Sequence, residues 1–380
     1  MPGRAYHRRV RIILHAGLHK SGTTSLQTSW NAAYSDHPDV WYPRRGDGRP
    51  PGHHDLVRPL LRAFGEDGAP DLVAARVAHS LRGRSGETLV NVIAQARERE
   101  VGTLLVSTEN LDRATAADRP VLDEALAGAD VTLVVTATRP VHRWCSGWQT
   151  LVKHGLAQYP ADAAPHVLDF AALRPGRLAE LVSLIPATRR VVRLVRTSPP
   201  EADLAADLAA SLGLPDPERA AGHPMQNTSL GTDTEVVLRI NRADRALGTS
   251  KAGRRLLAEL RGDGFVHRED PSLAERYALP EELLEGARVE AAWLGGLGAD
   301  SGVELLDPHD AWAGWLDWSV PDWYAEISRR DAVLPTLEPA EDRETQLWRV
   351  RQERAAYQRR LARVEKRSEG QGSEASTERR

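Results

Sequence analysis

The strongest constraint on the fold is a repeated alternation of short apolar runs with helix-like segments. Four runs are typical of buried strands, at residues 10–16, 103–107, 131–137 and 190–195. Segments rich in Ala, Leu, Glu and Arg separate or follow them, at residues 71–82, 88–100, 119–127, 176–184 and 201–212. Such alternation predicts βαβ units. We therefore expect a three-layer α/β/α fold with a central parallel sheet, and ligands bound beyond the carboxyl ends of its strands.

The alternation stops after about residue 220, where helix and loop patterns take over. A Trp-rich stretch and then a long charged segment follow, and the polar end of the chain has a composition typical of disorder. We accordingly divide the chain into four parts. These are a core at 8–250, a mostly helical C-terminal region at 251–338, a charged terminal helix at 339–367 and a disordered tail at 368–380.

Composition excludes several classes of protein. The formal net charge of −3 argues against a general nucleic-acid binder, which carries a basic excess. Cys145 is the single cysteine, so a disulfide framework and a Cys-rich zinc site are excluded. No run of about 18 apolar residues is present, so we expect no membrane span. The apolar stretch near the N-terminus is too short for a signal peptide, which makes the cytoplasm the default location.

The segment at 12–30 carries the most specific motif of the chain. An apolar strand leads into GLHKSGTT at residues 17–24, and a helical stretch follows. The two glycines have the G-x-x-x-x-G spacing of a phosphate-binding loop, where backbone N–H groups and a helix N-terminus surround an anion. Hydroxyl donors in the first helical turn come from Thr23, Thr24 and Ser25.

The lysine of this loop departs from the pattern of nucleoside triphosphatases. Those enzymes carry lysine directly after the second glycine, where this chain has Thr23, and its lysine is Lys20 inside the loop. Lysine is rare here, because 46 of the 50 Lys and Arg residues are arginine. A compact ammonium group suits a tight loop that reaches one oxygen, whereas a planar guanidinium would not fit in the same way.

The string HAGLHKSGTTSLQ at 15–27 resembles the 5′-phosphosulfate loop of bacterial sulfotransferases that use 3′-phosphoadenosine 5′-phosphosulfate (PAPS). The resemblance implies a P-loop-type fold and sulfuryl transfer, with 3′-phosphoadenosine 5′-phosphate (PAP) as product. It implies that Lys20 contacts the phosphosulfate bridge and stabilises the leaving phosphate. The nucleotide-binding residues that it implies in this loop are His19, Lys20, Ser21, Gly22, Thr23, Thr24 and Ser25. No metal is expected, because the histidines match no ligand spacing.

PAPS also needs a second anion site, for its 3′-phosphate. In the family, an arginine after a strand and a serine on the next helix, eight residues apart, hold this phosphate. Here Arg139 follows the run at 131–137, and Ser146 comes seven residues later. The resemblance therefore implies Arg139 and Ser146, with Arg143 as the alternative to Arg139 because the spacing is altered. The stretch at 227–241 also resembles the end of the sulfotransferase core.

A hydroxyl or amine acceptor must lose a proton as it attacks, so we expect a general base near the sulfuryl group. Glu109 follows the run at 103–107, on the expected active-site edge. The pair His53-His54 stands where many bacterial relatives have a histidine near the acceptor, and a neutral imidazole can act as a base near pH 7. His54 and Glu109 are nearly equal candidates, and His53 stays open as a third.

These features predict a PAPS-dependent sulfotransferase that acts on a hydroxyl or amine of a small molecule or glycan. Two other functions stay open: a non-catalytic nucleotide-binding protein on the same fold, and a P-loop kinase, which the position of Lys20 disfavours. We expect no nucleic-acid partner. The terminal helix at 339–367 is the surface through which we expect any oligomer to form, and the sequence leaves the acceptor and the oligomeric state open.

Overall fold

The structure of the chain is a computed structural model that describes the residues of all four predicted strands. The described residues are 10–18, 21–44, 51–57, 60–61, 88–153, 159–162, 176–195, 203–222, 234–235, 237–238, 266–269, 273–297, 299–306, 320, 322–328 and 330–333. Within these ranges, no helix combines the length and the apolar character that crossing a membrane requires. The predicted boundaries of the C-terminal region and the tail, at 250, 338 and 367, lie outside them.

The chain divides into two compact units. The first comprises Met1–Leu151, Gln158–Gly231 and Ala274–Glu326, and the second comprises Val152–Ala157, Thr232–Leu273 and Ile327–Arg380. In the second unit, β6 (Val266–Glu269) pairs antiparallel with β8 (Arg330–Val333). These strands and β7 of the first unit stand where a mostly helical C-terminal region was expected, so that expectation is not confirmed.

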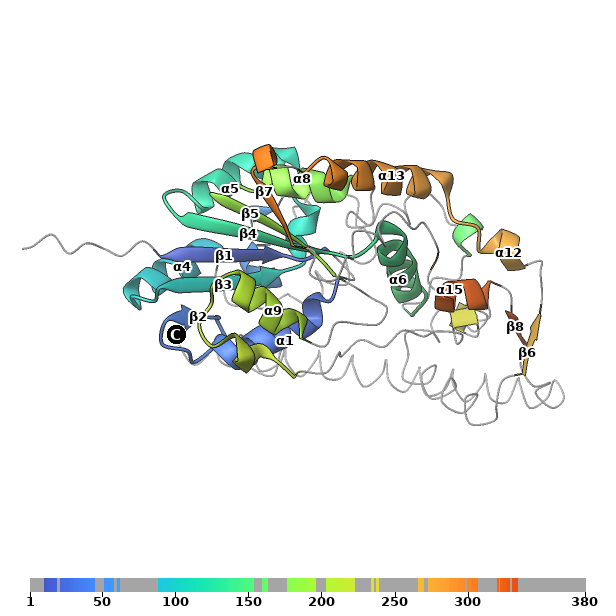
Figure 1. Cartoon of the computed structure of the whole chain (residues 1–380), viewed down its shortest axis with the longest axis horizontal. Coiled ribbons are helices and arrows are strands. Elements are labelled where there is room, and N and C mark those ends of the chain that lie inside the picture. Colours follow the sequence, from blue (N-terminus) through green and yellow to red (C-terminus); the bar gives the residue numbers. More distant parts are fainter. Residues whose placement is uncertain are drawn as a thin grey trace, which may run out of the picture. The chain divides into compact units, whose positions relative to one another are not determined.

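A six-stranded parallel sheet forms the centre of the first unit, in the order β2-β3-β1-β4-β5-β7 (Figure 1). Its strands are β1 (Arg11–Ala16), β2 (Val40–Trp41), β3 (Thr103–Thr108), β4 (Asp130–Ala137), β5 (Arg189–Leu194) and β7 (Val303–Leu306). The four predicted strands are confirmed as β1, β3, β4 and β5. The sequence did not indicate β2 and β7, the two edge strands, which are too short for a recognisable apolar run.

Helices cover both faces of this sheet. In the part of the chain that the structure describes, the helices of eight or more residues are α1 (Thr23–Tyr34), α4 (Leu89–Glu98), α6 (Pro140–Lys153), α8 (Arg177–Leu184), α9 (Leu204–Ser211) and α13 (Glu281–Gly295). The shorter ones are α2 (His54–Val57), α5 (Arg119–Ala125), α12 (Leu273–Arg276) and α15 (Asp322–Ile327). The 3-10 turns are η3 (Asn110–Arg113), η4 (Ala116–Asp118), η5 (Pro160–Asp162), η7 (Pro217–Ala220) and η8 (Ala299–Ser301). The structure is therefore a mixed α/β fold.

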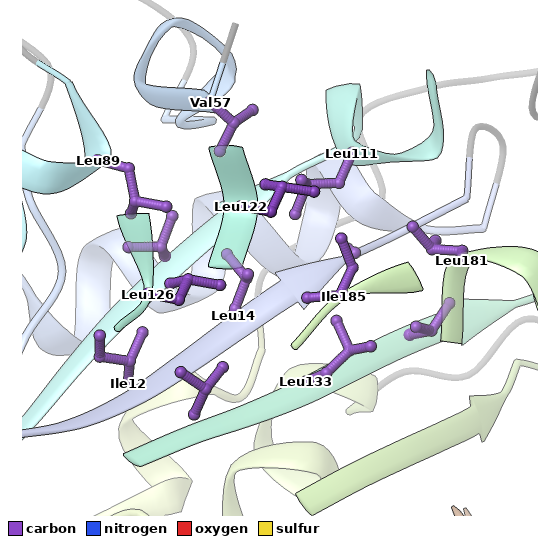
Figure 2. Close-up of a cluster of buried hydrophobic side chains, with 14 of the residues drawn as sticks. Ile12, Leu14, Val57, Leu89, Leu111, Leu122, Leu126, Leu133, Leu181 and Ile185 are labelled. Atoms are coloured by element: carbon purple, nitrogen blue, oxygen red, sulfur yellow. The ribbon is translucent and has the colours of Figure 1, made fainter. Parts of the chain in front are cut away.

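The two sheet faces bury different side chains of the same strands, as expected for a parallel sheet covered on both sides. On one face, Ile12 and Leu14 of β1 join Leu133 of β4 in an apolar core with residues of α4, α5 and α8 (Figure 2). On the other face, Ile13 packs in a second core with α1 and α9. Trp30 fastens these two helices, because its indole N–H donates to the carbonyl oxygen of Ala205 at 3.1 Å.

Candidate functional site

The carboxyl ends of β3, β1 and β4 lie side by side, and the segments after them carry most of the predicted site residues. After β1 the chain enters α1 on one face of the sheet, whereas the helix that leads back from β4 to β5, α8, packs on the opposite face. Neighbouring strands whose connections turn to opposite faces open a crevice at their carboxyl ends, which is where α/β sheets bind ligands.

The floor of this site is a row of polar side chains on the three central strands. His15 of β1 hydrogen bonds through Nδ1 to Ser107 Oγ of β3 at 2.7 Å and through Nε2 to Thr136 Oγ1 of β4 at 3.0 Å. All three side chains are fully buried. The edge of the Trp30 ring also packs against His15, at 5.5 Å between ring centroids. The hydrogen bonds of His15 therefore connect β1 to both of its neighbours, β3 and β4, below the loop that follows β1.

His15 is held in its neutral form. Burial lowers the pKa of His15 to about 3, although the nearby Glu109 carboxylate acts in the opposite direction. The imidazole consequently adds no positive charge to the site at neutral pH, and its two hydrogen bonds to hydroxyl groups give it a structural role. Any cation that an anionic ligand meets must come from other residues.

The loop after β1 is fastened to this floor. The backbone N–H of Leu18 donates to the Thr136 carbonyl at 3.2 Å, and the hydroxyl of Ser21 donates to the carbonyl oxygen of Leu18 and lies 3.2 Å from Thr136 Oγ1. Ser21 is fully buried, so its side chain holds the loop together. A β-carbon at Gly17 would lie 2.6 Å from Thr23 Cγ2 and 3.0 Å from Thr136 Oγ1, so only glycine fits there.

The N-terminus of α1 follows, and its geometry suits an anion. Gly22 precedes the helix in the left-handed conformation, with φ of 78°, which glycine adopts without strain. The first backbone N–H groups of a helix have no partner inside the helix, and they carry positive potential. The first turn contains no acidic residue, and Thr24 and Ser25 in it are half-buried.

In this first turn of α1, Thr23 has a buried hydroxyl group whose hydrogen bonding is incomplete. It is 2% exposed, and its Oγ1 has no hydrogen-bond partner among the described residues. A buried hydroxyl without a partner is costly, and an anion at the N-terminus of α1 would complete it. His19 and Lys20, predicted for the same loop, lie outside the described residues.

The predicted 3′-phosphate residues share one face of α6, Arg139 just before the helix and Ser146 near its middle. Arg139 directly precedes the helix, and Ser146 lies seven residues on, which is close to two full turns. Both are half-buried, as is His142 between them, whereas their neighbours on the helix are mostly buried. The guanidinium of Arg139 contacts His142 Nε2. The seven-residue spacing therefore still places the arginine and the serine on a common face.

Arg143, the alternative to Arg139, is buried in an ion pair with a residue of another helix. Its guanidinium is 1% exposed and forms two hydrogen bonds with the Glu290 carboxylate of α13, at 3.0 and 2.9 Å. It also donates to the Thr138 carbonyl at 2.8 Å. This buried ion pair joins α6 to α13 and leaves Arg139 as the better candidate for a phosphate.

The two adjacent histidines, His53 and His54, have different surroundings in the structure. His53 is fully buried, and both its ring nitrogens face backbone groups: Nδ1 accepts from the Ser107 N–H at 3.0 Å, and Nε2 lies 2.8 Å from the Pro43 carbonyl. Its ring also packs on Tyr42, at 4.3 Å between centroids. These contacts give His53 a structural role, which weakens its candidacy as a general base.

His54 and Glu109 are both half-buried and stand next to each other. The Nδ1 atom of His54 lies 3.3 Å from Thr108 Oγ1 and 3.4 Å from the backbone nitrogen of Glu109, whose N–H donates to it. The side chain of Glu109 makes no capping hydrogen bond to the turn that follows it. The structure thus brings the two leading candidates for the base to the end of β3.

Gln27 is a further candidate for the site that the sequence patterns did not single out. Gln27 stands one helical turn after Thr23, is 3% exposed, and has a side-chain nitrogen without a partner in the described structure. The available signal was its i, i+4 spacing from Thr23 inside the motif at 15–27. Most of the stretch at 227–241 lies outside the described residues, and Glu235 belongs to the second unit.

No protein-family model matches this chain, and neither a curated protein nor a solved structure matches it. In the part of the chain that the structure describes, no group of three or more His, Cys, Asp or Glu residues could hold a metal ion.

Proposed function

We propose that the chain is a PAPS-dependent sulfotransferase. The observation that carries the proposal is the unpartnered Oγ1 of Thr23, which is buried at the N-terminus of α1 beside Gly17 and Gly22. An anion held there would pair with this hydroxyl and with the first N–H groups of the helix. The resemblance of residues 15–27 to a phosphosulfate loop favours a nucleotide phosphosulfate as that anion.

The described residues fit such a ligand in two places. Thr23, Thr24 and Ser25 offer hydroxyl groups at the N-terminus of α1 for the 5′-phosphosulfate. Arg139, just before α6, and Ser146, near the middle of α6, share a face for the 3′-phosphate. β1 and β4, which precede these segments, are neighbours in the sheet, so a single nucleotide could engage both.

In the proposed reaction, PAPS supplies the sulfuryl group. A bond forms between the acceptor atom and sulfur, and the bond from sulfur to the bridging oxygen breaks with its electron pair on the departing PAP. Lys20 would stabilise the charge that grows on this oxygen, an interaction stronger in the transition state than in the ground state. The acceptor proton passes to a general base.

The contacts of His54 favour Glu109 as that base. Because Nδ1 of His54 accepts the N–H of Glu109, the neutral ring carries its proton on Nε2. An Nε2–H group can donate a hydrogen bond but cannot take up a proton. We therefore assign proton removal to the Glu109 carboxylate and a donor role to His54.

The proposal is tested by nucleotide binding and turnover. PAP should raise the melting temperature of the protein, and ATP with Mg²⁺ should not. With PAPS and a panel of acceptors, a Lys20→Ala variant should release PAP about 10²- to 10³-fold more slowly, as expected when one preorganised transition-state contact is removed. Lys251→Ala, which removes a lysine outside every motif, is the matched control.

Each other outcome points to one of the alternatives. Stabilisation by PAP without turnover in the unaltered protein would indicate a non-catalytic nucleotide-binding protein. Stabilisation by ATP and Mg²⁺ but not by PAP would indicate a kinase. Equal turnover in the protein and its Lys20→Ala variant would contradict the mechanism, because the lysine would then contribute nothing to the leaving group.

A further inference from the structure

Gln27 is a buried donor that nothing in the described structure satisfies. Its side chain lies on the same face of α1 as Thr23, one turn further along the helix. It is 3% exposed, and its Nε2 has no hydrogen-bond partner among the described residues. Buried polar groups in native proteins nearly always have partners, so an unpaired donor needs an explanation, and a group on a bound ligand would supply one.

The amide of Gln27 lies beside His54. A β-carbon at Gly52 would lie 2.6 Å from His54 Nε2 and 2.7 Å from Gln27 Oε1. The two polar atoms therefore lie on either side of the same point of the backbone, and a side chain at position 52 would displace one of them or both. Gly52 consequently lets Gln27 approach the histidine that we place near the reacting atoms.

This location is on the acceptor side of the proposed site. Gln27 and His54 stand near the end of β3, because His54 contacts Thr108 at the last position of that strand. Arg139 and Ser146, proposed for the 3′-phosphate, follow β4 on the other side of β1. Gln27 is also one turn beyond Thr23, counted from the anion-binding end of α1.

We propose that Gln27 donates a hydrogen bond from Nε2 to the attacking atom of the acceptor, and that this atom is a hydroxyl oxygen. A hydroxyl oxygen has two lone pairs, so one can accept from Gln27 while the other forms the bond to sulfur. An amine nitrogen has one lone pair and cannot do both. The inference rests on the proposed sulfotransferase function and narrows its acceptors to hydroxyl compounds.

The test uses a Gln27→Met variant of the full chain, which keeps the length of the side chain but removes its hydrogen-bonding groups. We expect PAP to raise the melting temperature of the variant as much as that of the unaltered protein. The rate of PAP release from PAPS is measured with water alone, with benzyl alcohol and with 4-nitrophenol. In each case we expect the variant to be about 10- to 100-fold slower than the unaltered protein, which is the range for a lost hydrogen bond to a reacting group. Benzylamine and 4-nitroaniline, the matched amines, should accept sulfuryl groups more slowly than the alcohol and phenol.

The stability of the variant provides a second readout. Replacing an unsatisfied amide by an apolar group should leave the melting temperature unchanged or raise it. The matched control is Gln149→Met on α6, since Gln149 is also buried, at 2%, and is not among the side chains that lack a partner. We expect that change to lower the melting temperature.

The outcomes separate this inference from the function on which it rests. If the unaltered protein binds no PAP, or binds it and transfers no sulfuryl group to water or to any acceptor, both proposals fail. If it transfers to alcohols and Gln27→Met does so equally well, the inference alone fails. A preference for the amines, or a loss of stability in Gln27→Met as large as in Gln149→Met, would likewise overturn only the role of Gln27.

Discussion

Two groups of buried polar side chains meet near the carboxyl end of β1, and they differ in how completely they are hydrogen bonded. Beneath the loop, His15 bonds to Ser107 and Thr136, and Ser21 bonds to the loop itself. Along α1, the side chains of Thr23 and Gln27 are also buried, but each has an atom without a partner in the described structure.

This difference in hydrogen bonding distinguishes side chains that hold the fold together (the scaffold) from side chains that we expect to contact a ligand (the ligand side). A satisfied buried network stabilises the fold and fixes its geometry. An unsatisfied buried donor costs stability, and we infer that α1 keeps two of them because a ligand completes them. The scaffold side should therefore respond to substitution by a loss of stability, and the α1 side by a loss of binding or turnover.

We expect the largest loss of stability when one partner of a buried ion pair is removed. Arg143→Met leaves the Glu290 carboxylate, which is fully buried, without its partner. Breaking a buried ion pair in this way should lower the free energy of unfolding by about 3–5 kcal/mol. Urea denaturation at neutral pH, followed by circular dichroism, measures this change.

Two controls sharpen this prediction. Arg119→Met removes an exposed pair with Asp123, which should cost less than about 1 kcal/mol. Replacing both partners, as in Arg143→Met with Glu290→Leu, should restore most of the lost stability, because no unpaired charge remains. If Arg143→Met weakened PAP binding without a stability loss, Arg143 would belong to the ligand side and the comparison would be wrong.

The second prediction concerns pH and the neutral His15. Its pKa is about 3 in the folded protein, against about 6.5 for an unperturbed histidine. Between these values the unfolded chain binds more protons, so stability falls as the pH decreases below about 6.5. At pH 5 the folded protein should be about 2 kcal/mol less stable than at pH 7 through this residue. His15→Asn should lose this part of the pH dependence, and an unchanged slope would contradict the prediction.

The sequence was informative where the fold and the positions of the candidate site residues depend on local pattern. The central strands were predictable because their apolar runs are long, whereas β2 has two residues and β7 four. The position of Thr23 at the start of a helix was also predictable, because the glycine spacing of the loop is a local pattern. The carboxyl edge of the parallel sheet then placed Glu109 near the site, as expected for a residue that follows a central strand.

Contacts between distant residues could not be predicted. The sequence favoured Arg139 and left Arg143 open as its alternative, and only the partner of Arg143, 147 residues away on α13, distinguishes them. His53 and His54 are adjacent, yet the fold buries one among backbone groups and leaves the other half-buried. The role that we propose for Gln27 also depends on the close approach of the loop at Gly52, which the i, i+4 spacing of Gln27 from Thr23 does not encode.

The smallest effect, and the most direct test of the comparison, comes from removing one hydroxyl on each side. Thr23→Val keeps the methyl group that packs at Gly17 and removes the unpartnered Oγ1. Its stability should be unchanged or higher, while PAP binding, measured by calorimetry, should weaken about 10-fold, or about 1.4 kcal/mol. Ser21→Ala removes a hydroxyl that has partners and should lower the free energy of unfolding by about 1 kcal/mol. If instead Thr23→Val destabilised the protein and left PAP affinity unchanged, Thr23 would belong to the scaffold, and the missing partner at Oγ1 would no longer mark a ligand site.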